Sequence, residues 1–179
     1  MATSRDPRVM PISGHAMELR SRATRAVASV IVAGIAGWFL VPSLVELASI
    51  GVGRLISVSP AETLTTYLST ALGIGVVVAS PVVIYQIWAF ILPGLVPDEE
   101  RFFRRYFPWL AVLFLLGVGF VSKWLYPGLM RNLLAAWSGL PAAVTVGQLM
   151  SFYVMLHLAF GAISDMPVVM MFLVHSGLI

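Results

Sequence analysis

Residues 63–97 contain no side chain that is charged at neutral pH, and this run ends abruptly at Asp98-Glu99-Glu100-Arg101. A helix needs roughly 20 apolar residues to cross a hydrocarbon layer about 30 Å thick. The run is therefore long enough for one tilted membrane span and short for two spans with a loop. It also contains Gln86, Pro81 and Pro93, which a plain anchor does not need. The run predicts a membrane helix that delivers an acidic cluster to the water surface.

The composition indicates that lipid is the solvent of this chain. Hydrophobic residues make up 59 % and charged residues 11 %, against roughly 45–50 % and 25 % in soluble globular domains. There are no cysteines, which excludes disulfides and thiolate metal sites. The net charge is +3, but the arginines stand at the ends of apolar segments instead of forming the continuous basic face that nucleic acid requires. No catalytic or cofactor motif is present, so we expect neither an enzyme nor a cofactor.

The apolar runs predict an all-α, polytopic membrane bundle. An amino-terminal arm of residues 1–22 precedes a bundle of residues 23–179, with spans at about 24–43, 64–92, 104–127 and 148–175. Ser59-Pro60-Ala61-Glu62 is a helix-start signal, with Ser59 as the cap. We expect Pro42 to end or bend the first span and Pro167 to break the fourth. Residues 131–147 are predicted to be a loop with an interfacial piece.

The distribution of Lys and Arg predicts the orientation of the bundle. With four spans, one side of the membrane holds eight of these residues and the other side holds three: Arg5, Arg8, Arg20, Arg22, Arg25, Arg101, Arg104 and Arg105, against Arg54, Lys123 and Arg131. The positive-inside rule then places both termini and the acidic cluster in the cytoplasm. No secretory signal is evident. Whether translation begins at Met1 or Met10 stays open.

Two acidic positions at this surface have alternative explanations. Asp98-Glu99-Glu100 follows Pro97, so these acids can simply complement the dipole of a helix that begins there. Likewise, Glu18 can form an i,i+4 ion pair with Arg22. The other hypothesis is that the two carboxylate sites together bind a ligand with two guanidinium groups, because each guanidinium fork can engage a carboxylate bidentately.

Asp165 is the second unusual acid, because a carboxyl group inside a span costs about 2.5 kcal/mol or more and by default indicates function. A proton relay is one possibility. A protonated side chain that is hydrogen-bonded within the bundle is the alternative. His157 and His175 stand eight and ten residues away, at least about 12 Å along a helix. We therefore expect them to be interfacial or packing residues, and we expect no metal site.

Several segments resemble the TatC family, the receptor subunit of the twin-arginine protein translocase. Residues 15–22 resemble its amino-terminal His-Leu-x-Glu-Leu-Arg-x-Arg signature, and residues 59–62 resemble the start of its second helix. Residues 79–95 contain its distinctive Pro-x-x-x-Tyr-Gln-x-Trp block. Residues 159–167 are similar to its fourth helix. The resemblance covers nearly the whole chain from His15 onward.

The resemblance implies binding of twin-arginine signal peptides and export of folded proteins, driven by the proton-motive force. It implies TatA- and TatB-type partners, several copies in a receptor complex, and a location in the cytoplasmic (inner) membrane. It places partner-helix docking within the membrane at Asp165 and Pro167. The signal-peptide site that it implies comprises Glu18, Leu19, Arg20, Gln86, Phe90, Pro93, Glu99 and Arg101.

The chain also departs from the family pattern. Ser69 stands where the second helix often carries Lys, and Asp165 replaces the usual Glu. The family has six helices, whereas this chain ends at Ile179 after the fourth predicted span. The alternatives therefore include a structural or non-functional four-helix fragment, and a small proton or ion transporter centred on Asp165.

Overall fold

The computed structural model describes residues 12–50, 52, 55–91, 97–136 and 144–176, and of their side chains all but those at 12–15, 97–99, 102 and 103. Nearly all of these residues lie in helices. The helices are α1 (Ile12–Gly37), η1 (Trp38–Leu40), α2 (Val41–Ala48), α3 (Pro60–Ile91), α4 (Pro97–Phe120), η3 (Val121–Leu125), α5 (Tyr126–Ala136), α6 (Val146–Ser164) and α7 (Met166–His175).

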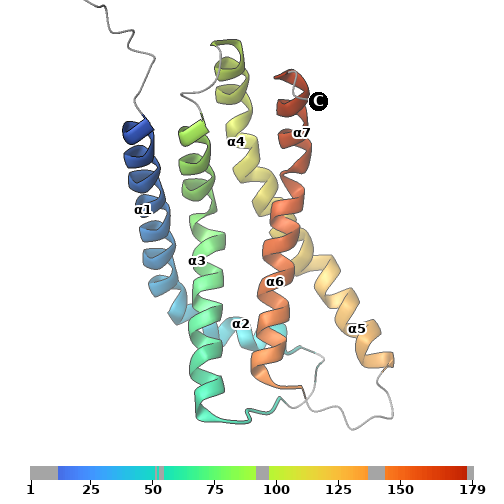
Figure 1. Ribbon diagram of the computed structural model, residues 1–179. Coiled ribbons are helices and arrows are strands. Elements are labelled where there is room, and N and C mark those ends of the chain that lie inside the picture. Colours follow the sequence, from blue (N-terminus) through green and yellow to red (C-terminus); the bar gives the residue numbers. More distant parts are fainter. Residues whose placement is uncertain (1–11, 51, 53–54, 92–96, 137–143, 177–179) are drawn as a thin grey trace, which may run out of the picture.

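Four helical rods are long and apolar enough to cross a membrane, which confirms the predicted all-α class with four spans. They comprise Ala16–Ala48, Pro60–Ile91, Arg104–Ala136 and Val146–His175. Helix α3 packs against α1 on one side and against α6 and α4 on the other (Figure 1). The starts of α1 and α4 and the ends of α3 and α7 lie together (Figure 1). We call this the arginine-rich end, and the opposite end the α2 end.

The first rod changes direction before its proline. Helix α1 ends at Gly37, a 3-10 turn follows, and Pro42 occupies the first turn of α2. The bend expected near Pro42 is therefore present, but α1 ends earlier, at Gly37, and not at the proline. Pro42 stands where a missing N–H group breaks no helical hydrogen bond. Helix α2 then crosses the base of the bundle (Figure 1).

The third rod is longer than the sequence predicted. Helix α4 passes through the π-helical segment η3 into α5, which ends at Ala136. Residues 131–136, expected to belong to a loop, are therefore helical. Tertiary packing accounts for the difference: Tyr126 and Met130 are buried in the core beside Ala48, and the Tyr126 hydroxyl donates to the Ala48 carbonyl at 2.6 Å.

The predicted cap of α3 is present, and Glu62 does more than the capping motif requires. The Glu62 amide donates to Ser59 Oγ at 3.1 Å, as the sequence predicted. The Glu62 carboxylate accepts from the Val58 amide at 2.7 Å and from the Gly147 amide at 3.3 Å. The second bond crosses to α6, so Glu62 fastens the start of α3 to the start of α6. We call these contacts the Glu62 clasp.

Candidate functional site

Glu18 is half-buried on α1, and its two carboxylate oxygens have different surroundings. Oε1 accepts from Arg22 Nε at 3.0 Å, which is the i,i+4 pair that the sequence predicted. Oε2 is buried and has no hydrogen-bond partner among the described residues. Because an ionised carboxylate only accepts hydrogen bonds, half of this group lacks a donor.

Gln86 lies near the same end of the helix pair as Glu18, on the neighbouring helix. Gly34 of α1 lies opposite Ala71 of α3, and Gly75 of α3 lies opposite Val30 and Gly34. Since the two helices are antiparallel and rise equally per residue, this register places Glu18 opposite the last turns of α3, within about two turns of Gln86. Gln86 Oε1 is also buried without a hydrogen-bond partner in the described part of the chain. The contact between α1 and α3, which we call the α1–α3 seam, thus has two buried acceptor oxygens without donors near the same end.

Other residues that the resemblance assigns to the signal-peptide site lie near this end of α1 and α3. Phe90 lies one turn further along α3 and is half-buried. Leu19 and Arg20 are exposed on α1. Their exposure leaves them accessible from outside the bundle. Pro93 lies outside the described residues.

The acidic cluster begins α4 at the same end of the bundle (Figure 1). Glu100 is paired with Arg104, through Nε at 3.1 Å and Nη2 at 2.8 Å, and Arg101 is exposed. Glu99 lies in the first turn of α4, where a negative charge is favoured by the helix dipole. Its side chain lies outside the described part of the structure. The structure thus brings the helix ends that carry Glu18 and Glu99 to one surface.

Asp165 occupies the break in the fourth rod, as predicted. It follows α6 and precedes α7, and its carbonyl accepts from the amides of Val168 and Val169 at 3.1 and 3.2 Å. Its side-chain Oδ1 is buried without a partner among the described groups, whereas Pro167 is exposed. Helix α7 separates Asp165 from the arginine-rich end by about 15 Å, so it forms a separate candidate site.

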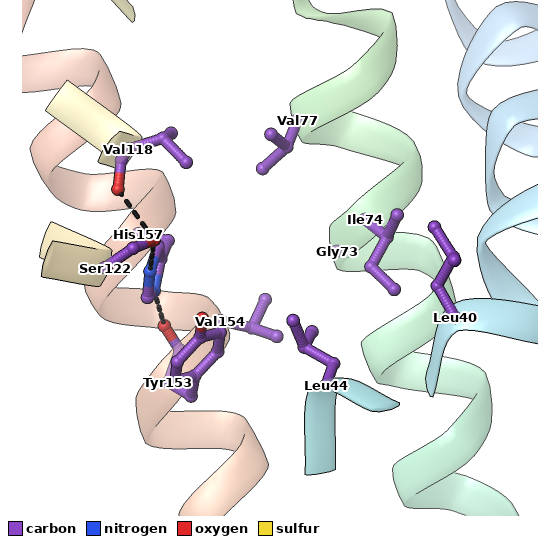
Figure 2. A pocket seen from close by; sticks show the side chains of 10 residues that line it. All are labelled: Leu40, Leu44, Gly73, Ile74, Val77, Val118, Ser122, Tyr153, Val154 and His157. Atoms are coloured by element: carbon purple, nitrogen blue, oxygen red, sulfur yellow. Dashed lines mark hydrogen bonds between the residues drawn. The ribbon is translucent and has the colours of Figure 1, made fainter. Parts of the chain in front are cut away.

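A polar cluster inside the bundle was not predicted as a unit. His157 is buried, in line with a packing role, and contacts Ser122 and Tyr153 at the wall of a cavity (Figure 2). These residues come from η3 and α6, so sequence spacing gave no signal of their contact. Among the described residues, no three His, Asp or Glu side chains gather as metal ligands would.

The fold defines a multi-pass membrane protein built from four spanning rods, with a partly unsatisfied polar site at one end. The family model for Sec-independent protein translocase protein (TatC) matches residues 14–179. The chain is 34 % identical over 179 residues to TatC of Aquifex aeolicus, covering 95 % of this chain and 75 % of that protein. It is 31 % identical over 176 residues to TatCy of Bacillus subtilis, covering 95 % and 69 %.

A solved structure agrees with these matches. The crystal structure of a twin arginine translocase receptor, TatC, superimposes with a TM-score of 0.81 at 29 % identity, covering 92 % of this chain and 76 % of that one. The chain belongs to the TatC family of Sec-independent protein translocase components. The resemblance read from residues 15–22 and 79–95 is thereby confirmed.

Proposed function

We propose that this protein is a receptor subunit that binds twin-arginine signal peptides at the arginine-rich end. The observation that carries the proposal is the pair of unsatisfied acceptors, Glu18 Oε2 and Gln86 Oε1, near one end of the α1–α3 seam. A guanidinium group carries only donors in a planar fork. An arginine side chain of the peptide therefore supplies the kind of donor that these oxygens lack.

The Glu18–Arg22 pair is compatible with this role. Arg22 engages Oε1 and leaves Oε2 for the ligand, so the carboxylate is shared between two guanidinium groups. The second arginine of the signal peptide meets the acids in the first turn of α4, with Glu99 as its partner. Exposed Leu19, Arg20 and Arg101 flank the peptide, and Phe90 and Pro93 provide apolar contacts beside it.

The remaining parts of the proposal concern the assembly. The arginine-rich end faces the cytoplasm by the positive-inside rule, in the inner membrane. TatA- and TatB-type subunits are the partners, and several copies form a receptor complex that exports folded proteins using the proton-motive force. Partner helices dock within the membrane at Asp165 and Pro167, where buried Oδ1 lacks a donor.

Charge reversal tests the receptor function. In a Glu18→Lys, Glu99→Lys double variant, we expect cross-linking to an Arg-Arg signal peptide to be lost while membrane insertion is retained. Glu46→Lys is the matched control, because Glu46 is an exposed acid on α2 at the opposite end. Unchanged cross-linking of a properly inserted double variant would defeat the proposal.

A small proton transporter centred on Asp165 is the second candidate, since the unpartnered Oδ1 also suits a proton carrier. It predicts proton flux in reconstituted vesicles without any export substrate, abolished by Asp165→Asn. Absence of flux in the parent protein would remove this candidate and leave helix docking as the role of Asp165.

A further inference from the structure

A cavity of about 210 Å³ lies inside the bundle between α3, α6, the α4–η3 rod and the turn from η1 to α2 (Figure 2). Most of its lining is apolar. The polar side chains in its wall are Ser122, Tyr153 and His157. His157 is 5 % exposed, so its ring depends on the protein for hydrogen bonds. Ser122 comes from the π-helical segment η3.

The hydrogen bonds of this cluster determine where one proton sits. His157 Nδ1 lies 2.7 Å from the Tyr153 carbonyl oxygen, which can only accept, so Nδ1 carries hydrogen. His157 Nε2 lies 2.9 Å from Ser122 Oγ. Ser122 Oγ also lies 3.1 Å from the Val118 carbonyl oxygen, to which it donates. Figure 2 shows the chain from Val118 through Ser122 and His157 to Tyr153.

Both protonation states of the ring satisfy this chain. With a neutral imidazole, the single hydroxyl hydrogen of Ser122 can go to the bare Nε2. With a second proton on His157, Nε2–H donates to Ser122 Oγ, and the Ser122 hydroxyl donates to the Val118 carbonyl. Both N–H groups of an imidazolium ring therefore have acceptors, so the cluster can hold the added proton without leaving a buried donor unpaired.

The surroundings supply further contacts for a cationic ring. The Tyr153 ring lies 4.0 Å from the His157 ring, centroid to centroid, and an aromatic face attracts a cation. Burial opposes the charge.

Among the described residues, no charged side chain lines the cavity: α3, η1, α2 and α4 contribute aliphatic groups and glycine. Of the nearby titratable groups, Tyr126 packs on Tyr153, Lys123 stacks over Trp124, and Glu46 is exposed.

We propose that His157 and Ser122 form a proton-binding site within the membrane, in which Nε2 takes up one proton from water and donates it in a hydrogen bond to Ser122 Oγ. The bound proton converts the ring to imidazolium, and no other bond is made or broken. This site lies apart from Asp165 and from the seam at Glu18. It goes beyond the proposed receptor function, and either can fail without the other.

Nitrogen NMR of the histidine rings in nanodiscs tests the site directly. The chain has three histidines, His15, His157 and His175, and a His157→Gln variant identifies the His157 signals by their loss. At about pH 8 we expect a neutral ring with hydrogen on Nδ1 and a bare Nε2. On acidification to about pH 5, within the range where histidine titrates, both nitrogens become protonated.

Two substitutions separate the proton site from simple packing. At the pH where half of the parent His157 is protonated, Ser122→Ala is expected to lower the protonated fraction several-fold, because Nε2–H loses its acceptor. Ser122→Thr retains the hydroxyl and is expected to restore it. The proposal is overturned if the neutral ring carries its hydrogen on Nε2, if the ring stays singly protonated to about pH 5, or if Ser122→Ala titrates like the parent. Should Ser122→Ala fail to fold, the parent titration alone decides.

Discussion

Gly75 lies where the backbones of α1 and α3 approach each other closely. A Cβ atom built there would lie 2.5 Å from the Val30 carbonyl oxygen and 2.8 Å from the Gly34 backbone nitrogen. Both obstacles are backbone atoms, which cannot rotate away as a side chain does. Small residues at such crossings let membrane helices pack by van der Waals contact. Gly75 thereby allows the close packing of α1 and α3, which places Glu18 and Gln86 near the same end of the two helices.

A Gly75→Val substitution is therefore expected to force the two helices apart, at a cost of about 1–3 kcal/mol. The measurement is thermal unfolding of the purified protein in detergent, together with cross-linking of the Arg-Arg signal peptide. Gly119→Ala is the control, because a Cβ atom at Gly119 meets no other atom within 4 Å. If the Gly75→Val variant is as stable as the Gly119→Ala variant, the close approach of α1 and α3 at Gly75 does not contribute to the stability of the fold.

Tyr126 is the residue that joins the third rod to α2. Its hydroxyl donates to the Ala48 carbonyl, and both residues are buried. Tyr126→Phe leaves that carbonyl without its donor, which we expect to destabilise the fold by about 1–3 kcal/mol. Tyr85→Phe changes an exposed tyrosine and serves as the comparison in the same unfolding assay. Equal midpoints for the two variants would show that the Tyr126 bond contributes nothing.

At the scale of elements, the Glu62 clasp holds the starts of α3 and α6 together. A Glu62→Leu variant removes acceptors from the Val58 and Gly147 amides. We expect faster hydrogen exchange at these two amides, with little change near Asp165. Glu46→Leu removes an exposed acid from α2 and controls for the loss of charge. Unaltered exchange at Gly147 would contradict the clasp.

The sequence predicted the elements whose cause is local and missed those whose cause is tertiary. Long uncharged runs predict membrane-spanning helices, because a backbone in lipid must satisfy its hydrogen bonds within itself. Ser59 predicts a helix cap because its hydrogen-bond partner, the Glu62 amide, is only three residues away. The π-helical segment, helix α5 beyond residue 130 and the Glu62–Gly147 bond depend on contacts between distant segments. No periodicity in the sequence reveals such contacts.

For the candidate site, too, the sequence identified residues and local contacts but not the contacts between distant segments. The resemblance to the family motifs singled out Glu18 and Gln86. The i,i+4 spacing of opposite charges predicted the ion pair between Glu18 and Arg22. That Glu18 and Gln86 lie near the same end of the seam follows only from the register of the two helices at Gly34 and Gly75. The cluster around His157 gave no signal, because Ser122 lies 35 residues away in sequence.

At the scale of the whole molecule, arginines concentrate at one end of a lipid-facing bundle, where the unpartnered oxygens of Glu18 and Gln86 also lie. Many large apolar side chains are exposed along the rods, as a bilayer requires. The arginine-rich end combines the α1–α3 seam with the acidic start of α4 (Figure 1). In our account this end faces the cytoplasm and receives the signal peptide, while Asp165 and His157 lie within the membrane.

The most direct test places a photoreactive phenylalanine analogue at position 90, beside the unsatisfied acceptors of the seam. The protein is reconstituted in vesicles with the arginine-rich end accessible from one known side, and a labelled signal peptide is added from each side in turn. We predict an adduct with the Arg-Arg peptide from the cytoplasmic side and none with a Lys-Lys peptide, because Lys lacks the planar fork. An equal yield with Lys-Lys, or an adduct formed from the opposite side, would contradict the account.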